Sequence, residues 1–86
     1  MELLKVSAKS NPNSVAGALT GMIRERGTAQ LQAIGAGALN QSLKAIAIAR
    51  GFMALNNVDL VCVPGFTEVD IEGKKTTAMR LIVETR

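Results

Sequence analysis

The chain has 86 residues, 48% of them hydrophobic, and carries a formal net charge of +3. A chain of this length supports one hydrophobic core, so we expect a single domain over residues 1–86. Histidine is absent, which removes the commonest general base and the commonest metal ligand. We therefore expect a non-enzymatic protein without a metal or another cofactor. The modest positive charge favours polyanionic partners without requiring them.

The sequence predicts a cytoplasmic location. No run of residues approaches the ~18 consecutive apolar residues of a membrane span, and the first five residues lack the layout of a signal peptide. The one cysteine, Cys62, lies in an apolar run, where a small buried side chain in a reducing compartment is the expected role.

A strand over residues 3–8 and a helix over residues 12–26 open the chain. Asn11 and Pro12 are typical of a capped helix start, and Gly27 is typical of a left-handed helix end. Between these positions apolar residues recur at helical spacing. They are Val15, Ala18, Leu19, Met22 and Ile23.

An alternating strand over residues 28–34 precedes a second helix, predicted over residues 38–55. This helix is apolar on more than one face, and a sheet covers only one face. One stripe contains Leu39, Leu43, Ile46 and Met53, and the other contains Ala45, Ile48, Ala49 and Phe52. We expect the stripe that the sheet leaves open to pack partly on the first helix and partly on a second copy of the chain. Small residues such as Ala45 and Ala49 let another helix approach closely.

Two strands over residues 58–66 and 76–83 end the chain, with a hairpin tip over residues 70–75. The order is therefore βαβαββ. Its two crossover connections are expected to be right-handed, which places both helices on one face of the sheet. The predicted fold is a two-layer α/β (α+β) domain with a four-stranded mixed sheet.

Polar residues gather at the two strand-to-helix turns, residues 9–13 and 35–41. Both turns emerge at the same edge of the sheet, so two helix N-termini and Lys9 are expected to meet there. Backbone N–H groups at a helix start suit phosphate oxygens, whether on a nucleic acid or on a small anion. An alternative is that the polar side chains only cap the helices. Those side chains are Asn11, Asn13, Ser14, Asn40 and Gln41.

Two other patterns are weaker. Alternation puts Glu68, Asp70 and Glu72 on one side of an extended segment, where they could hold a hard cation. A solvated hairpin edge explains these carboxylates better. Residues 73–77 are similar to the end of a phosphate-binding loop but lack the earlier glycine that such a loop requires.

Several runs of the chain resemble the stage V sporulation protein S family, and together they cover essentially its whole length. They are KVSAKSNPNSVAGAL at residues 5–19, IGAGALNQ at residues 34–41, AIAIARGF at residues 45–52 and LIVE at residues 81–84. More distantly, the layout is similar to Alba-type chromatin proteins and to the C-terminal domain of translation initiation factor three. This resemblance implies a mixed sheet in which the fourth strand lies between the second and the third, with the last strand antiparallel.

The resemblance to Alba proteins implies dimers that bind DNA or RNA through three features. These are a lysine in the first strand-to-helix turn, basic residues at the start of the second helix, and a hairpin arm. Lys9 matches the first feature. Gly35 and Gly37 stand where Alba proteins are rich in arginine, so phosphate contact there is expected from backbone N–H groups and from Asn40 and Gln41. Lys74 and Lys75 lie at the tip of an otherwise acidic arm. The predicted nucleic-acid-binding residues are Lys9, Ser10, Asn13, Gly35, Gly37, Asn40, Gln41, Lys44, Lys74 and Lys75.

We therefore expect a small nucleic-acid-binding regulator that tolerates many sequences of DNA or RNA, forms a homodimer or a higher homo-oligomer, and does not bind membranes. The family resemblance implies a role in sporulation or a related developmental step. The alternative is a protein–protein interaction module of a sporulation or cell-division pathway, favoured by the low aromatic count and the acidic arm. A small anionic ligand at residues 35–41 is a third hypothesis.

Overall fold

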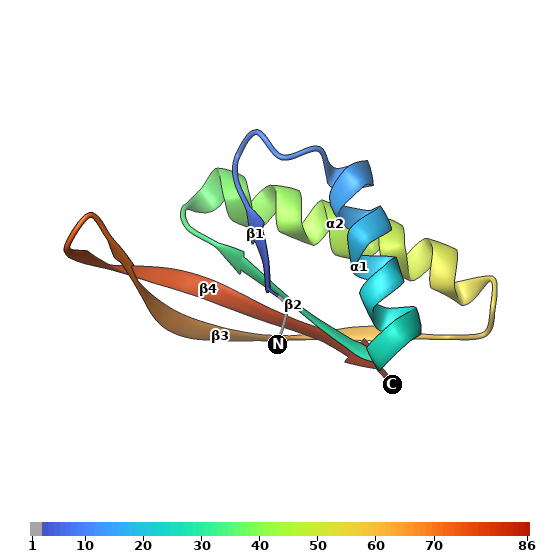
Figure 1. The fold of residues 1–86 in the computed structure, drawn as a ribbon. Coiled ribbons are helices and arrows are strands. Elements are labelled where there is room, and N and C mark those ends of the chain that lie inside the picture. Colours follow the sequence, from blue (N-terminus) through green and yellow to red (C-terminus); the bar gives the residue numbers. More distant parts are fainter. Residues whose placement is uncertain (1–2) are drawn as a thin grey trace.

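In the computed structural model, which describes residues 3–86, strands and helices alternate in the predicted order before a final hairpin (Figure 1). The first strand is shorter than predicted, because the chain turns immediately after Val6. The elements are β1 (Leu3–Val6), α1 (Pro12–Arg26), β2 (Thr28–Ala33), α2 (Ala36–Ala54), β3 (Leu60–Ile71) and β4 (Lys74–Thr85).

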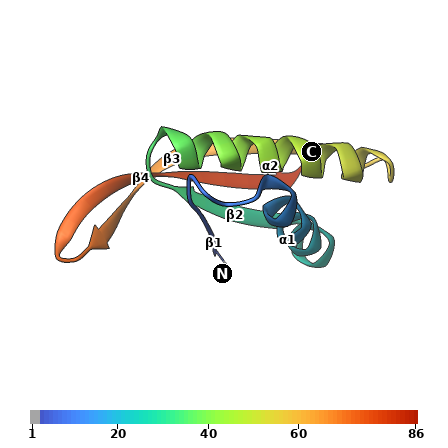
Figure 2. The same ribbon diagram turned by 90° about the horizontal axis from the view of Figure 1, so that it is seen from above.

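The strands form one mixed sheet with the order β1-β2-β4-β3. β1 and β2 run parallel, whereas β4 is antiparallel to both β2 and β3. Both helices cover the same face of this sheet (Figure 1 and Figure 2). The predicted fold class and the strand order implied by the Alba resemblance are therefore confirmed.

The core lies between the helices and the inward-facing strand residues. Leu31 of β2 is fully buried and lies in register between Leu4 and Leu81, while Ala29 faces Val83. Buried and half-buried residues alternate along β2, as expected for a strand with one face on the core. Aliphatic and small side chains fill this core, and both phenylalanines of the chain lie on its surface.

Helix α1 has the predicted bounds because its capping signals are local. The side-chain oxygen of Asn11 accepts hydrogen bonds from the backbone N–H groups of Asn13 and Ser14, at 2.8 and 3.3 Å. Pro12 occupies the first turn, where its missing N–H costs nothing. Gly27 ends the helix with a left-handed φ of 78°.

Helix α2 begins two residues earlier than predicted, after a glycine cap. Gly35 has a φ of 87° and a ψ of 163°, a region open essentially to glycine alone. Ala45 and Ala49 are fully buried in the core that the two helices share, as predicted for small residues that let another helix approach closely, while packing of α2 on a second copy stays a prediction. Leu43 and Phe52, which the stripe pattern predicts to be covered, are 49% and 55% exposed.

The final hairpin is longer than predicted. β3 continues to Ile71 and β4 starts at Lys74, so the tip contains Glu72 and Gly73 rather than residues 70–75. Both tip residues have left-handed φ values, 52° and 77°, which is the geometry of a tight two-residue hairpin turn. The acidic residues before the tip are therefore part of a strand.

The outer half of this hairpin, residues 67–78, is an arm. Pairing between β2 and β4 stops at Met79, so the arm residues find strand partners only within the hairpin. Figure 1 shows the arm curving away from the sheet at the end of the molecule where α2 begins.

Candidate nucleic-acid interface

The loop between β1 and α1 lies directly against the start of α2. A Cβ atom built on Gly37 would stand 2.8 Å from the Cβ of Ala8, closer than real side chains approach. The side-chain amide of Gln41 donates a hydrogen bond of 2.9 Å to the Ser10 carbonyl. The two strand-to-helix turns therefore meet, as the sequence predicts, and residue 37 is glycine because a side chain does not fit there.

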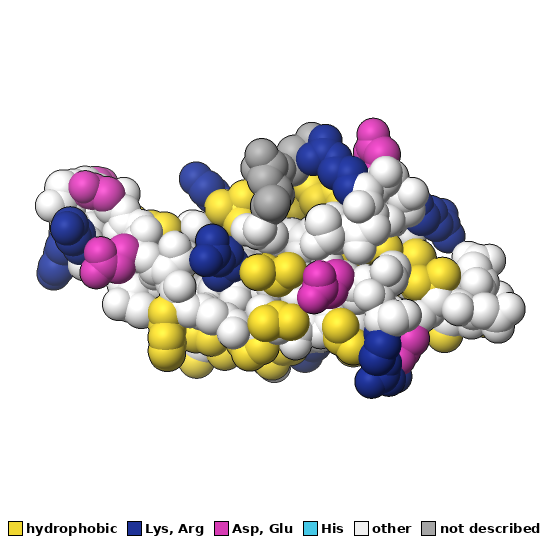
Figure 3. All heavy atoms as spheres, turned by 90° about the horizontal axis from the view of Figure 1, so that it is seen from below, with side chains coloured by type: hydrophobic (Ala, Val, Ile, Leu, Met, Phe, Trp, Pro, Cys, Tyr) yellow, Lys and Arg dark blue, Asp and Glu magenta, His cyan; other side chains and the backbone are white. Residues whose placement is uncertain are grey.

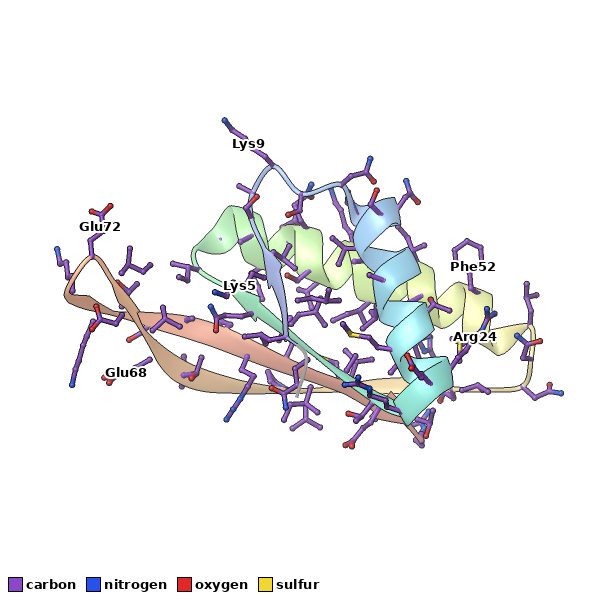
Figure 4. The ribbon with its side chains drawn as sticks, viewed as in Figure 1. Lys5, Lys9, Arg24, Phe52, Glu68 and Glu72 are labelled. Carbon is purple, nitrogen blue, oxygen red and sulfur yellow. The ribbon has the colours of Figure 1, made fainter. Side chains whose placement is uncertain are left out.

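Lys9 is held near the tip of a tight, serine-rich loop. The Ser7 N–H donates to Ser10 Oγ at 2.9 Å, and the Lys9 N–H donates to Ser7 Oγ at 3.2 Å. These bonds fix the backbone and engage the Ser10 hydroxyl. The side chain of Lys9 is exposed and points away from the protein (Figure 4). Its ammonium group is therefore free to meet a phosphate.

The start of α1 is closed by its own cap. Asn11 already accepts hydrogen bonds from two N–H groups of the first turn. The capping explanation therefore holds for Asn11, and an anion at this position would have to displace its side chain. Asn13 and Ser14 take part in the cap through their backbone N–H groups, and both residues are exposed.

The start of α2 is open. Gly35 has no side chain, so the cap residue itself accepts no hydrogen bond from the N–H groups of residues 36–38, and no other side chain among residues 3–86 is seen as their acceptor. The first bond of the helix runs from the Leu39 N–H to the Gly35 carbonyl, at 3.1 Å. Unpaired N–H groups and the positive end of the helix dipole favour an anion here. Of the two helix starts that meet, one is available to a ligand and the other is not.

Asn40 and Lys44 extend this open start along α2. They are four residues apart, lie on the same helix face and are exposed. Gln41 is half-buried, and its amide N–H group is occupied by the Ser10 carbonyl. The residues gathered here, which we call the α2 lip, are Lys9, Gly35, Ala36, Gly37, Asn40 and Lys44.

The arm carries both signs of charge. Lys74 and Lys75 are exposed, but Asp70 lies opposite Lys75 in the strand register, and Glu72 stands at the tip. Figure 3 shows basic and acidic side chains side by side at this end of the molecule. A hollow of about 560 Å³ lies between the arm and the loop after β1. The arm lysines are thus at the same end as the α2 lip but separated from it.

A comparison with protein-family models identifies the family of this chain. The model of the family described as stage V sporulation protein S (SpoVS) matches residues 2–86. The chain belongs to the SpoVS family. Membership confirms the resemblance in the four sequence runs and makes this a sporulation-related protein. The family description names no ligand and no partner.

Two arginines of the SpoVS chain are held by one carboxylate at the far end of α2. Arg50 Nε donates to Asp59 Oδ1 at 3.0 Å, and Arg86 Nη2 donates to Asp59 Oδ2 at 2.5 Å. The hydrogen bond from Arg86 has the largest effect and lowers the pKa of Asp59. Desolvation opposes this shift, and Arg50 adds to it. The bridge fastens α2 to the ends of the hairpin strands.

The surroundings of Cys62 disfavour its thiolate form. The residue is half-buried rather than fully buried, packs against the core, and burial raises the pKa of its thiol. Within residues 3–86, no three His, Cys, Asp or Glu side chains are placed to hold a metal ion. No helix in the same range is long and apolar enough to cross a membrane.

Sequence reasoning predicts an open apolar stripe on α2 that includes Leu43, but it does not specify two surface features of the chain. One is the apolar edge, a name that we give to the exposed side chains of Leu43 on α2 and Phe66 on the edge strand β3, which are 49% and 76% exposed. The other is a hollow beside Phe52, between α1 and the end of α2. The sequence does hold a signal for the hollow, because Gly17 and Gly21 stand one turn apart inside a helix that does not favour them.

Proposed function

We propose that this sporulation-related protein is a non-enzymatic regulator that binds the backbone of DNA or RNA at the α2 lip and acts as a homodimer. The observation that carries the proposal is the uncapped start of α2, which packs against the loop that presents the exposed side chain of Lys9. Both groups favour a phosphate, since the N–H groups are donors of fixed direction and the ammonium group is a point charge.

Contacts of this kind do not depend on base sequence, because phosphate contacts position a protein without reading the bases. The small residues at the start of α2 let a phosphate approach the backbone closely. Asn40 and Lys44 extend the contact to neighbouring phosphates. Neutralising about four phosphates per dimer gives a slope of log K against log salt near −4 on duplex DNA.

The apolar edge at Leu43 and Phe66 supports the homodimer. β3 is an edge strand, and alternation along it puts Phe66 on the same side of the sheet as Leu60, the side that the helices cover. Pro64 interrupts the N–H donors of β3, so a contact through side chains is favoured over a continuous sheet. A second copy on this edge removes two large apolar side chains from water and provides a second α2 lip.

The direct test is titration of labelled duplex and single-stranded oligonucleotides at low and moderate salt. Lys9→Ala should weaken binding to every sequence alike and reduce the salt slope of the dimer by about two, since each copy loses one phosphate contact. Arg80→Ala is the control, because Arg80 is also an exposed cation, but alternation along β4 puts it on the opposite side of the sheet from the buried Leu81 and therefore from the helices. Absence of binding by the unmodified protein at about 50 mM salt overturns the proposal.

The second candidate function is a protein-interaction module that binds no nucleic acid. The mixed charge of the arm and the exposed Phe66 favour it. Affinity capture before and after nuclease digestion separates the two functions, since partners lost after digestion support nucleic-acid binding and partners retained support the alternative. A small anion at the α2 lip would be indicated if inorganic phosphate raised the melting temperature while oligonucleotides did not bind.

A further inference from the structure

A hollow of about 440 Å³ lies between α1 and the end of α2, at the opposite end of α2 from the α2 lip. This volume lies within the range of small-ligand sites. Helix α1 contributes Gly17, Thr20, Gly21 and Arg24, and the end of α2 with the turn after it contributes Phe52 and Asn56.

The packing of this chain does not require Gly17 or Gly21. A Cβ atom added to either would meet no atom within 4 Å. Alanine is markedly more favourable than glycine inside a helix, so the fold alone does not account for two glycines one turn apart. Their effect is to keep this wall of the hollow flat. An outside group can therefore approach the backbone of α1 closely.

Thr20 lies between the two glycines and adds a polar group without a partner. The residue is 8% exposed, and its Oγ1 atom has no hydrogen-bond partner among residues 3–86. Buried hydroxyl groups almost always have a partner in folded proteins. Rotation about χ1 exchanges the hydroxyl and methyl groups, and threonine in helices uses two χ1 rotamers. Because Thr20 lines the hollow, this rotation would present the hydroxyl to a group bound there.

An aromatic ring, a cation and an amide surround the same hollow. Phe52 is 55% exposed, although aromatic side chains usually contribute to a core. The side chains of Arg24 and Asn56 are exposed, and no hydrogen bond or ion pair within residues 3–86 engages them. Figure 4 shows Arg24 and Phe52 on α1 and on the last turns of α2. Proteins hold the unpaired bases of single strands with groups of this kind.

We infer that this hollow is a subsite for one nucleotide of a single strand of RNA or DNA, which rests on the proposed nucleic-acid function. The base stacks on Phe52, and the guanidinium group of Arg24 meets its phosphate. The Thr20 hydroxyl and the Asn56 amide bond to the edge of the base. A base inside a duplex is already stacked on its neighbours and does not reach this hollow. The subsite therefore favours single strands, whereas the α2 lip accepts both forms.

Fluorescence anisotropy of a labelled single-stranded oligonucleotide, and of the duplex of the same sequence, tests the subsite. Phe52→Leu removes the aromatic face and keeps most of the apolar volume. It should weaken single-strand binding about tenfold and leave duplex binding unchanged. Phe66→Leu is the matched control, because it makes the same substitution at the other exposed phenylalanine. Since Phe66 belongs to the proposed dimer contact and not to the hollow, any loss with this variant should affect single strand and duplex alike.

Gly21→Leu is a second variant, which fills the hollow from the other wall. It should weaken single-strand binding to a similar extent, and its melting temperature should not fall, because leucine is the better helix former and its Cβ has room. Lys9→Ala, by contrast, should weaken both single-strand and duplex binding. The two hollow variants should therefore lose single-strand binding alone, whereas the α2 lip variant should lose binding to both forms.

The outcomes distinguish the subsite from the proposed function. If the unmodified protein binds duplex but Phe52→Leu binds the single strand as tightly as before, the inference is overturned and the proposed function stands. If the unmodified protein binds neither form, the proposed function fails and the subsite with it. A loss of single-strand binding alone with Phe66→Leu instead would move the base contact to Phe66 on β3. Altered sedimentation of Phe52→Leu with unchanged affinity for the single strand would assign the hollow to contact with a second copy. The result with Phe66→Leu and this result would each overturn the subsite.

Discussion

At the α2 lip, the identity of single residues is set by how closely two segments of the chain approach. Gly37 faces Ala8 at a distance that leaves no room for a side chain, and Gly35 has a backbone conformation that other residues rarely adopt. Arginine side chains like those of Alba proteins therefore do not fit at the first of these positions. In the proposed contact, backbone N–H groups would meet a phosphate where the resemblance to Alba proteins implies cationic side chains.

Substitution of Gly37 by alanine tests this close approach. The added Cβ would lie 2.8 Å from the Cβ of Ala8, which is fixed to the backbone and cannot rotate away. Overpacking of this kind costs about 1–3 kcal/mol, so Gly37→Ala should lower the free energy of unfolding in urea by that amount. Gly51→Ala is the control, because its Cβ meets nothing and alanine should stabilise the helix by roughly 0.5–1 kcal/mol. Equal stability of Gly37→Ala and the unmodified protein would show that the loop moves freely.

At the scale of elements, the sequence predicts well those helix and strand ends that local chemistry decides. The bounds of α1 follow from Asn11, Pro12 and Gly27, which act on their own helix ends. The start of α2 is predicted two residues late, because its glycine cap makes no side-chain bond that a cap pattern would reveal. The hairpin is predicted too short, because Asp70 and its acidic neighbours disfavour strands in isolation and pair only across the arm.

For the candidate site too, the sequence predicts the general arrangement but not the individual hydrogen bonds. Topology alone predicts that the two strand-to-helix turns meet, and the contacts of Gly37 and Gln41 bear this out. Which polar groups remain available depends on individual hydrogen bonds that periodicity does not specify. Asn11 closes the start of α1, and Ser10 engages Gln41 through its carbonyl. Capping therefore accounts for one helix start, while the other keeps its N–H groups unpaired.

The contact between α2 and the hairpin ends predicts a specific pH dependence. The pKa of Asp59 is lower in the folded protein than its unfolded value, near 3.8. The bridge therefore stabilises the fold fully at a pH above the unfolded pKa, and this stabilisation is lost as the pH falls through the lower, folded pKa. Asp59→Asn should therefore lower the melting temperature at neutral pH, and the difference should vanish in strong acid. The effect should be modest and weakened by salt, because Arg50 and Arg86 are 59% and 69% exposed.

Glu68→Gln is the control for this pH dependence, since it neutralises an exposed carboxylate on the arm, away from the Asp59 bridge. Its melting temperature should follow that of the unmodified protein throughout the titration. A constant difference between Asp59→Asn and the unmodified protein from neutral to acidic pH would mean that the bridge contributes through packing rather than charge.

At the scale of the whole molecule, α2 separates the two proposed contacts with nucleic acid. The helix has 19 residues, which corresponds to about 28 Å at the usual rise per residue. The α2 lip lies at its start, and the hollow beside Phe52 lies near its end. A backbone contact at one end and a base contact at the other would together select extended single strands over short oligonucleotides. Leu43 lies between them along α2 and is exposed, and the proposed homodimer would cover it with a second copy.

Leu43→Glu tests the assembly and its consequence for binding. A carboxylate at this 49% exposed position should oppose a contact between two copies without disturbing the core. Sedimentation should then report a monomer, whereas Val63→Glu, a matched change on the other side of β3, should leave the dimer intact. Because a monomer presents one α2 lip instead of two, its salt slope on duplex DNA should fall from about −4 to about −2. Monomers of the unmodified protein, or an unchanged slope for Leu43→Glu, would contradict the dimer on this edge.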